Sequence, residues 1–211
     1  MLWRSREGRE IAAERFGPPD GPVAVLAFGA IHGDEPGSAE LMHRFAVKLR
    51  DMRLEEAVVI VPVVNPDGLA RHQKDNAAGV DLNRNFDAQS WSAVHPPGYH
   101  PGDAPLSEPE SAGLAALVEA CAPRVIVAVH QPFRCVNWDG PAGALAARMS
   151  DACGYPPVAS VGYPTPGSFG ACYGIDRGIA VITFELPRPV PDADWAGCLA
   201  ALACTLGAGR G

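Results

Sequence analysis

Four stretches of the chain are continuous runs of apolar residues rich in valine, isoleucine and alanine, and they predict buried strands. They are Val23–Gly29, Ala57–Val63, Arg124–His130 and Ala180–Glu185, with a weaker fifth around Val158–Val161. A strand with one face in water alternates apolar and polar residues, whereas these runs are continuous. We therefore expect a sheet that is covered on both faces, as in α/β proteins.

Between these runs lie segments with the pattern of helices, namely Ser38–Arg50, Ser107–Ala120, Ala142–Cys153 and Asp194–Leu206. The first carries Leu41, Phe45 and Leu49 at four-residue spacing, which places them on one helical face. In the second, Ser107 is expected to cap the helix and Pro109 to stand in its first turn. Strands that alternate with helices predict an α/β three-layer sandwich, a mixed and mainly parallel sheet with helices on both faces.

Composition narrows the class of protein. The 211 residues include 17 Lys and Arg against 24 Asp and Glu, so the formal charge of -7 argues against nucleic-acid binding. We read residues 1–211 as a single domain, without a signal peptide or a membrane span, and expect it in the cytoplasm. Six cysteines, none in a C-x-x-C motif, are expected to be reduced core residues. The oligomeric state is open.

Three of the predicted strands end at residues that bind metals or carry protons. His32 and Glu35 follow the first run, His130 ends the third and Glu185 ends the fourth. Such ends meet at one edge of a parallel sheet. Two histidines and a carboxylate leave one position open on a single zinc ion, as in catalytic sites, and Glu185 could then move protons. Considered alone, each histidine could be a buried, hydrogen-bonded core residue, and each carboxylate could be a salt-bridge partner.

The polar segment 65–87 indicates binding of an anion. It opens with the turn motif NPDG and carries Arg71, Lys74 and Arg84 among several asparagines. A guanidinium group can hold a carboxylate through two parallel hydrogen bonds. A single asparagine here would more simply satisfy its own turn, but the cluster as a whole favours a small substrate with a free carboxylate.

These motifs, in this order, resemble the zinc carboxypeptidase family. The matching pieces, which span roughly residues 4–190, are SREGREI, HGDE, NPDG, GVDLNRNF, SEPES, His130 and FELP. The stretch SVGYPTPGSFGACYG and the proline two residues after His130 look similar to the murein peptide amidase branch. That resemblance implies hydrolysis of an amide next to a C-terminal residue bearing a carboxylate, namely the γ-D-Glu–meso-diaminopimelate bond of murein peptides, during cytoplasmic recycling.

The resemblance also implies a role for each matching residue. The zinc ligands are matched by His32, Glu35 and His130, and the general base by Glu185. Asn83 and Arg84 match the pair that grips the terminal carboxylate of the substrate. Tyr163 lies in the loop where the family often carries a tyrosine that covers the substrate, and Tyr173 is a rival for that place.

One position departs from the family pattern. The family usually has an arginine shortly before GVD that polarises the scissile carbonyl, and the best-aligned residue here is Lys74. Lysine supplies charge without the planar fork of arginine, so the role falls to Lys74 or to Arg71.

Two other functions stay open on the sequence alone. An N-acyl amino acid deacylase of the succinylglutamate desuccinylase and aspartoacylase type shares H-x-x-E and a D-x-N-R-x-F-like segment, although NPDG, SEPES and GSFG favour the peptidase. A non-catalytic peptide-binding module could keep the fold alone, although such relatives normally lose a ligand or the base, and this chain retains all four.

Overall fold

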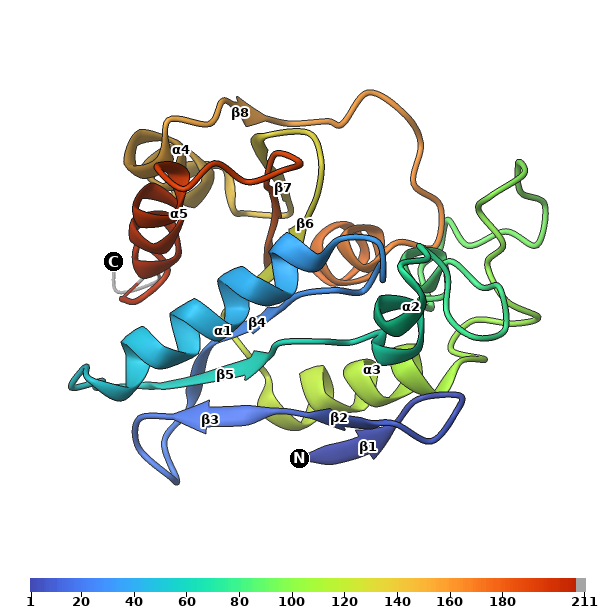
Figure 1. Cartoon of the computed structure of the whole chain (residues 1–211), viewed down its shortest axis with the longest axis horizontal. Coiled ribbons are helices and arrows are strands. Elements are labelled where there is room, and N and C mark those ends of the chain that lie inside the picture. Colours follow the sequence, from blue (N-terminus) through green and yellow to red (C-terminus); the bar gives the residue numbers. More distant parts are fainter. Residues whose placement is uncertain (208–211) are drawn as a thin grey trace.

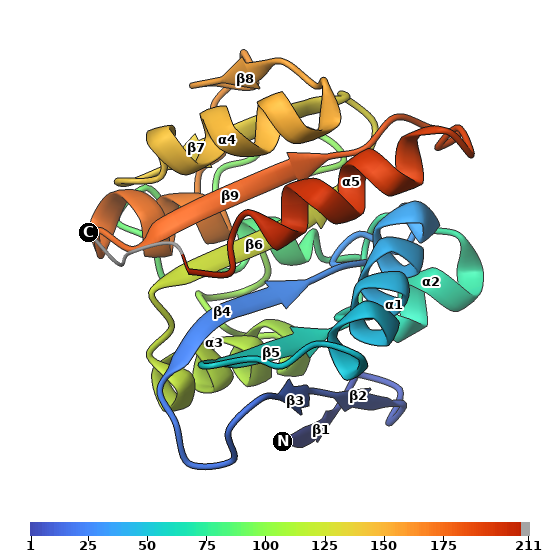
Figure 2. The same cartoon turned by 90° about the vertical axis from the view of Figure 1, so that its left-hand side faces the viewer.

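A seven-stranded sheet forms the centre of the molecule in the computed structural model, which describes residues 1–207. Residues 208–211, the end of the predicted single domain, lie outside the described residues. The strand order is β3 (Glu14–Phe16), β5 (Ala57–Val61), β4 (Val23–Phe28), β6 (Val125–His130), β9 (Ala180–Glu185), β7 (Cys135–Asp139) and β8 (Pro157–Val158). The four central strands are parallel, whereas β3 and β7 run antiparallel to their inner neighbours (Figure 2).

Helices cover both faces of this sheet, which confirms the predicted α/β three-layer fold. One face carries α1 (Pro36–Arg50), α4 (Gly143–Cys153) and α5 (Asp194–Ala203), and the other carries α3 (Pro109–Cys121) and the π-helical segment η2 (Gly170–Asp176) (Figures 1 and 2). Along β4, Val25 and Ala27 join the core under α1, while Leu26 and Phe28 join the core under α3. Both faces of β4 are therefore buried, and this is why its sequence is continuously apolar.

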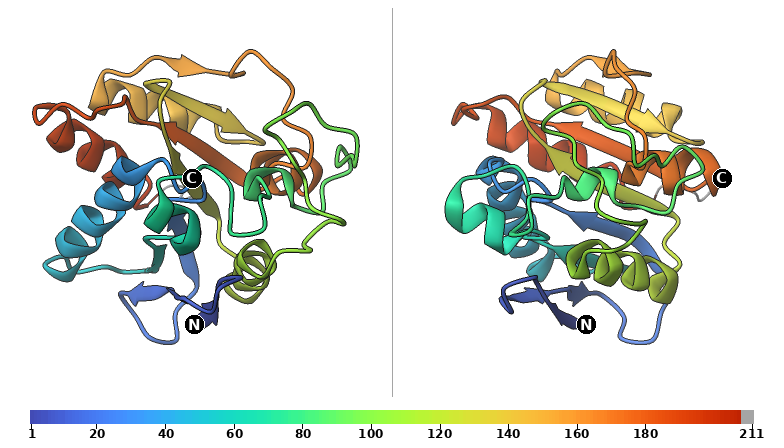
Figure 3. Two further views of the ribbon diagram at one scale, coloured as in Figure 1. Left: turned by 45° about the vertical axis from the view of Figure 1, so that its right-hand side comes forward. Right: turned by 90° about the vertical axis from the view of Figure 1, so that its right-hand side faces the viewer.

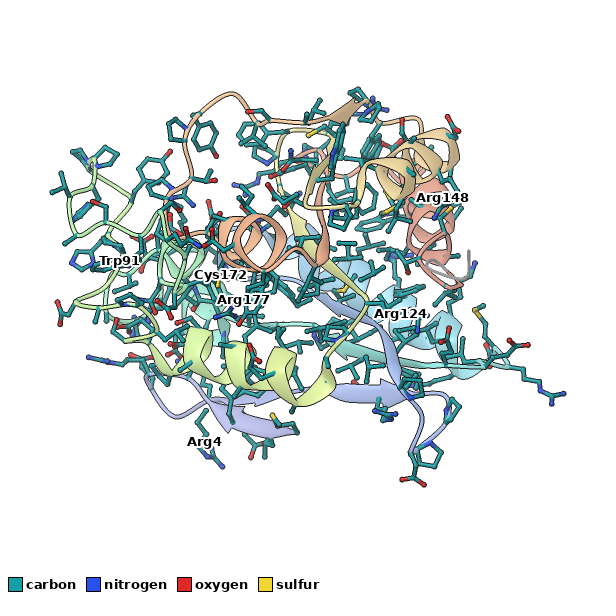
Figure 4. The ribbon with its side chains drawn as sticks, turned by 180° about the vertical axis from the view of Figure 1, so that it is seen from behind. Arg4, Trp91, Arg124, Arg148, Cys172 and Arg177 are labelled. Atoms are coloured by element: carbon teal, nitrogen blue, oxygen red, sulfur yellow. The ribbon has the colours of Figure 1, made fainter. Side chains whose placement is uncertain are left out.

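Several smaller elements lie outside the seven-stranded sheet and its covering helices. They are the hairpin β1 (Leu2–Arg4) and β2 (Glu10–Ala12), the short helix α2 (Pro66–Arg71) and the single turn η1 (Leu82–Arg84). Arg177, at the end of η2, forms a salt bridge of 3.2 Å with Glu119 of α3, and Figure 4 shows it beside that helix. In the described part of the chain, no helix combines the length and apolarity needed to cross a bilayer.

The four predicted central strands are confirmed, and β9 has the predicted bounds. Of the fifth run, predicted around Val158–Val161, only Val158 lies in a strand, the two-residue β8. The pattern of apolar runs did not reveal β7, because its sequence CVNWD mixes polar and apolar residues on a strand with one face toward a cavity.

The predicted helices are also present, but one cap was wrong. Glu108, not Ser107, occupies the N-cap of α3, because Pro109 takes the first helical position and so sets the cap one residue before it. The Ser107 hydroxyl instead donates to the Glu108 carboxylate at 3.0 Å. The last predicted helix ends at Ala203 rather than Leu206.

Candidate metal centre and pocket

His32, Glu35 and His130 meet at the C-terminal edge of the sheet. Their potential ligand atoms all lie within 4.8 Å of one another, and all three side chains are buried. Nδ1 of His32 lies 2.9 Å from Glu35 Oε1, and Nδ1 of His130 lies 3.0 Å from Glu35 Oε2. The parallel pairing of β4 with β6 brings the loop after β4 next to the end of β6, so residues far apart in sequence share one site.

The backbone around this site is tightly packed. A Cβ at Gly33 would stand 2.0 Å from the carbonyl carbon of Gly68, so only glycine lets the loop after β4 lie against the segment after β5. The Gly33 N–H donates to the Lys74 carbonyl at 3.1 Å and ties the two loops together. Pro36 then begins α1 directly after Glu35, which sets the position of that carboxylate.

Asp81 orients the first histidine. Its fully buried carboxylate lies 3.0 Å from Nε2 of His32 and accepts from the Asn83 N–H at 3.0 Å. In a neutral ring this contact places the proton on Nε2 and leaves the Nδ1 lone pair facing Glu35 and His130. Sequence reasoning did not single out Asp81, although it stands inside the quoted motif GVDLNRNF.

The electrostatics of the cluster favour a cation. Burial opposes charge on His32, but the carboxylates of Glu35 and Asp81 outweigh it and raise the pKa of His32 to about 10. Burial likewise opposes charge on Glu35, but His32 and His130 lower the pKa of Glu35 to about 2. Lone pairs from two imidazoles and one carboxylate, converging in a buried space, match the donor set of a catalytic zinc site.

Glu185 stands beside this cluster. It is the last residue of β9, in register with His130 of β6, and its side chain lines the same cavity. The N–H of Phe133 approaches one of its oxygens at 3.4 Å. Burial raises the pKa of Glu185, although His130 opposes the shift, and a carboxylate with a raised pKa is a better proton acceptor near neutral pH.

A cavity of about 690 Å³ opens from the metal cluster and contains the predicted carboxylate-binding residues Asn83 and Arg84. Arg84 is buried, and its Nη1 donates to the Asn83 carbonyl at 2.7 Å. The Asn83 Oδ1 accepts from the N–H of Phe169 at 3.0 Å, which leaves its amide nitrogen as the donor group. The two side chains thus offer donors to an anion in the cavity.

The two candidate tyrosines lie in different environments. Tyr163 is 41% exposed and lines the cavity, in the loop that precedes η2. Tyr173 is buried, its ring 4.5 Å from that of Phe169, and it is not among the residues that line the cavity. Figure 3 shows the loop of Tyr163 on the same side of the molecule as the long loop between η1 and α3, which contributes Tyr99.

The structure separates the two candidate cations. Lys74 lines the cavity, where its Nζ lies 2.5 Å from Asp81 and donates to the Gly98 carbonyl at 2.8 Å. Its ammonium also stands 4.0 Å from the centre of the Tyr99 ring. Arg71 does not line the cavity; its guanidinium is paired with Glu7 at the surface.

Comparison with known proteins agrees with this geometry. The model of the zinc carboxypeptidase family matches residues 3–138, more than half of the chain. The chain belongs to the zinc carboxypeptidase family. It is therefore a zinc-dependent hydrolase, and the cluster of His32, Glu35 and His130 is the group of described residues that fits the metal.

Three known proteins show how far the similarity extends in sequence and in structure. The chain is 36% identical over 174 residues to murein peptide amidase A of Escherichia coli K12, which covers 77% of this chain and 70% of that protein. The crystal structure of murein-tripeptide amidase MpaA from Escherichia coli O157 aligns with a TM-score of 0.75 at 32% identity, over 96% of this chain and 87% of that one. Carboxypeptidase A from Helicoverpa armigera shares the fold, with a TM-score of 0.79 at 20% identity over 99% and 68% of the two chains.

Proposed function

We propose that this protein hydrolyses the γ-D-Glu–meso-diaminopimelate amide bond of murein peptides. The observation that carries the proposal is a three-ligand metal cluster and a buried glutamate at one end of a cavity that also holds a buried arginine. The similarity to murein peptide amidase A supports the choice of bond. We treat the whole chain as one catalytic domain for this reaction.

Arg84 and Asn83 would position the substrate. Arg84 donates one bond to the Asn83 carbonyl and has further N–H groups for a carboxylate in the cavity. Holding the terminal carboxylate there would place the neighbouring amide near Glu185, and Tyr163, which also lines the cavity, would cover it. Fixing the reacting groups in this way lowers the entropic part of the barrier.

His32, Glu35 and His130 would hold the metal, and a bound zinc ion supplies Lewis acidity, which makes water more acidic and a carbonyl more electrophilic. Glu185 would take a proton from the attacking water and return it to the departing nitrogen. Its burial keeps the carboxylate out of bulk water and raises its pKa, which makes it a better proton acceptor.

Lys74, rather than Arg71, would stabilise charge on the scissile carbonyl oxygen. Asp81, the Gly98 carbonyl and the face of Tyr99 hold its ammonium group at the cavity wall. A fixed cation facing a developing oxyanion lowers the barrier more than a solvated one, because it needs no reorganisation during the reaction. Arg71 is paired with Glu7 at the surface and would take no part.

The test is to assay zinc-loaded protein against the tripeptide L-Ala-γ-D-Glu-meso-diaminopimelate, acetyl-aspartate and succinyl-glutamate. Release of diaminopimelate from the tripeptide is the expected result, with Glu185→Gln as the inactive control. Cleavage of the acyl amino acids alone would contradict the proposal and support a deacylase. Tripeptide binding without zinc and without turnover would support a non-catalytic binding module.

We propose the cytoplasm as the compartment and recycling of wall peptides as the context. All six cysteines are free thiols, and burial raises the pKa of Cys135 and of Cys172 to about 11, which suits unreactive thiols in a reducing compartment. Cell fractionation with an antibody against the protein tests this, and recovery with secreted or envelope proteins would contradict it.

A further inference from the structure

Two buried acids stand at the start of α3, outside the cavity. Glu108 and Glu110 are both buried, and neither lines the cavity wall. Both accept from the side-chain amide nitrogen of Asn76, at 2.8 and 3.2 Å. Burial raises the pKa of Glu110, because the charged form loses its water. Two buried carboxylates also repel each other, so they need the donors of Asn76 to remain side by side.

The loop between β1 and β2 covers these acids from the outside. The N–H of Arg6 donates to Glu110 Oε1 at 2.8 Å, and the Arg6 guanidinium lies 3.6 Å from Glu108. Figure 1 shows this loop beside the start of α3. The same loop is tied to α2, since Asp67 accepts from the Ser5 hydroxyl at 2.8 Å. The motifs SREGREI, NPDG and SEPES therefore meet in one polar network, although they lie far apart in the sequence.

Asn76 closes the turn that separates Lys74 from Asp81. Its Oδ1 accepts from the N–H groups of Ala78 and Val80 at 3.0 and 3.1 Å. Its own N–H donates to the Val80 carbonyl at 2.9 Å. Lys74 and Asp81 stand on either side of this turn, and their side chains pair at 2.5 Å. The contact between these two side chains thus depends on the closure of the turn.

The two glutamates fix the direction in which the Asn76 amide faces. An amide has an acceptor on one side and donors on the other, and a rotation by half a turn would exchange them. The oxygen would then face the carboxylates of Glu108 and Glu110, and the nitrogen would face the N–H groups of the turn. Each of these contacts would be repulsive. The acids therefore hold Oδ1 toward the turn from the fixed start of a helix.

We infer that Glu108 and Glu110 are positioning residues. They act through Asn76 on the ion pair of Lys74 and Asp81. This inference rests on the proposed function, because it concerns the placement of the ammonium group that faces the scissile carbonyl. Neither glutamate lines the cavity, so their effect on the reaction is indirect. A misplacement of about 1 Å in an active site lowers the rate about a hundredfold, so a loosened turn should be visible in kcat.

The main variant is Asn76→Asp, which keeps an acceptor oxygen for the turn but replaces the amide donor by a third carboxylate. With zinc-saturated protein and the tripeptide L-Ala-γ-D-Glu-meso-diaminopimelate, kcat should fall at least about tenfold. KM should change by less than about threefold, because Arg84 still holds the carboxylate. A kcat within about twofold of wild type would overturn the inference, since the turn would then need no donor to the acids.

A second variant tests the acids themselves. Glu110→Ala should also lower kcat, and Glu110→Gln should restore most of the loss, because a glutamine oxygen can still accept from Asn76. Wild-type kcat in Glu110→Ala would show that Glu110 does not position the turn and would overturn its role.

Two comparisons separate positioning from a loss of stability. In a Lys74→Ala background, Asn76→Asp should lower kcat by less than about threefold, because the group that it displaces is already absent. Full multiplication of the two losses would overturn the inference. Ser5→Ala removes a buried hydrogen bond from the same network without touching the turn. It should lower the thermal midpoint while kcat stays within about twofold of wild type, and a loss of kcat equal to that of Asn76→Asp would count against positioning.

A measurement without substrate separates this inference from the proposed function. The Lys74 ammonium stands 4.0 Å from the centre of the Tyr99 ring, so the NMR shifts of its side chain report its place. In zinc-free protein these shifts should move in Asn76→Asp and stay at the wild-type position in Ser5→Ala. If wild type does not cleave the tripeptide but the shifts move in this way, the proposed bond is wrong and the role of the network stands. Unchanged Lys74 shifts in Asn76→Asp would overturn the inference even in an active enzyme.

Discussion

Replacing Asp81 with asparagine should weaken zinc binding while leaving the fold intact. Asp81 is fully buried and lies 3.0 Å from Nε2 of His32 and 2.5 Å from Nζ of Lys74. Asparagine has nearly the same shape but no charge. It therefore removes the negative acceptor that holds the proton on Nε2 and leaves Nδ1 free to bind the metal.

The expected size of the effect follows from this contact. Loss of an outer partner of a metal-bound histidine lowers metal affinity about tenfold to a hundredfold. That range corresponds to about 1.4–2.8 kcal/mol, which agrees with about 1.5–3 kcal/mol for one hydrogen bond to a charged group. The Lys74 ammonium also loses its anion, so turnover of zinc-saturated Asp81→Asn should fall as well.

The assay is competition for zinc between the protein and a chromophoric chelator at pH 7. Asp75→Asn is the matched control, because Asp75 lies in the same segment and its Oδ1 has no hydrogen-bond partner. Asp75 makes no hydrogen bond or ion pair with His32 and acts on it only through longer-range electrostatics, so the zinc affinity of Asp75→Asn should change much less than that of Asp81→Asn, by no more than about twofold. A zinc affinity of Asp81→Asn within twofold of wild type, with thermal unfolding unchanged, would refute the role given to Asp81.

Three further outcomes are expected. Glu185→Gln should lower kcat about a thousandfold while zinc content measured by atomic absorption stays the same, and undiminished turnover would rule out Glu185 as the base. Lys74→Ala should lower kcat about a hundredfold or more, whereas Arg71→Ala should change it by less than about threefold; equal losses would contradict the separate placement of the two residues. Removing zinc with a chelator should lower the thermal midpoint, and zinc at about 100 times its Kd should restore about 2.7 kcal/mol, or roughly 5–10 °C. An unchanged midpoint would show that the described metal cluster does not bind zinc in the folded state.

The central strands and most helices could be predicted from the sequence. Strands buried on both faces need long apolar runs, and β4, β5, β6 and β9 are such runs. The same reasoning placed His32, His130 and Glu185 at strand ends, and parallel pairing alone brings strand ends of this kind to one edge. The meeting of these three residues could therefore be predicted from the apolar runs together with the rule that the ends of parallel strands lie at one edge of a sheet.

The remainder of the pocket depended on contacts that local pattern does not encode. Strand β7 has a polar face because it lines the cavity, so the pattern of apolar runs did not indicate a strand there. The different positions of Lys74 and Arg71 depend on their partners, Asp81 in the cavity wall and Glu7 at the surface. Sequence periodicity reports which face of an element is buried, whereas the partner of each polar side chain is set only when distant segments pack together.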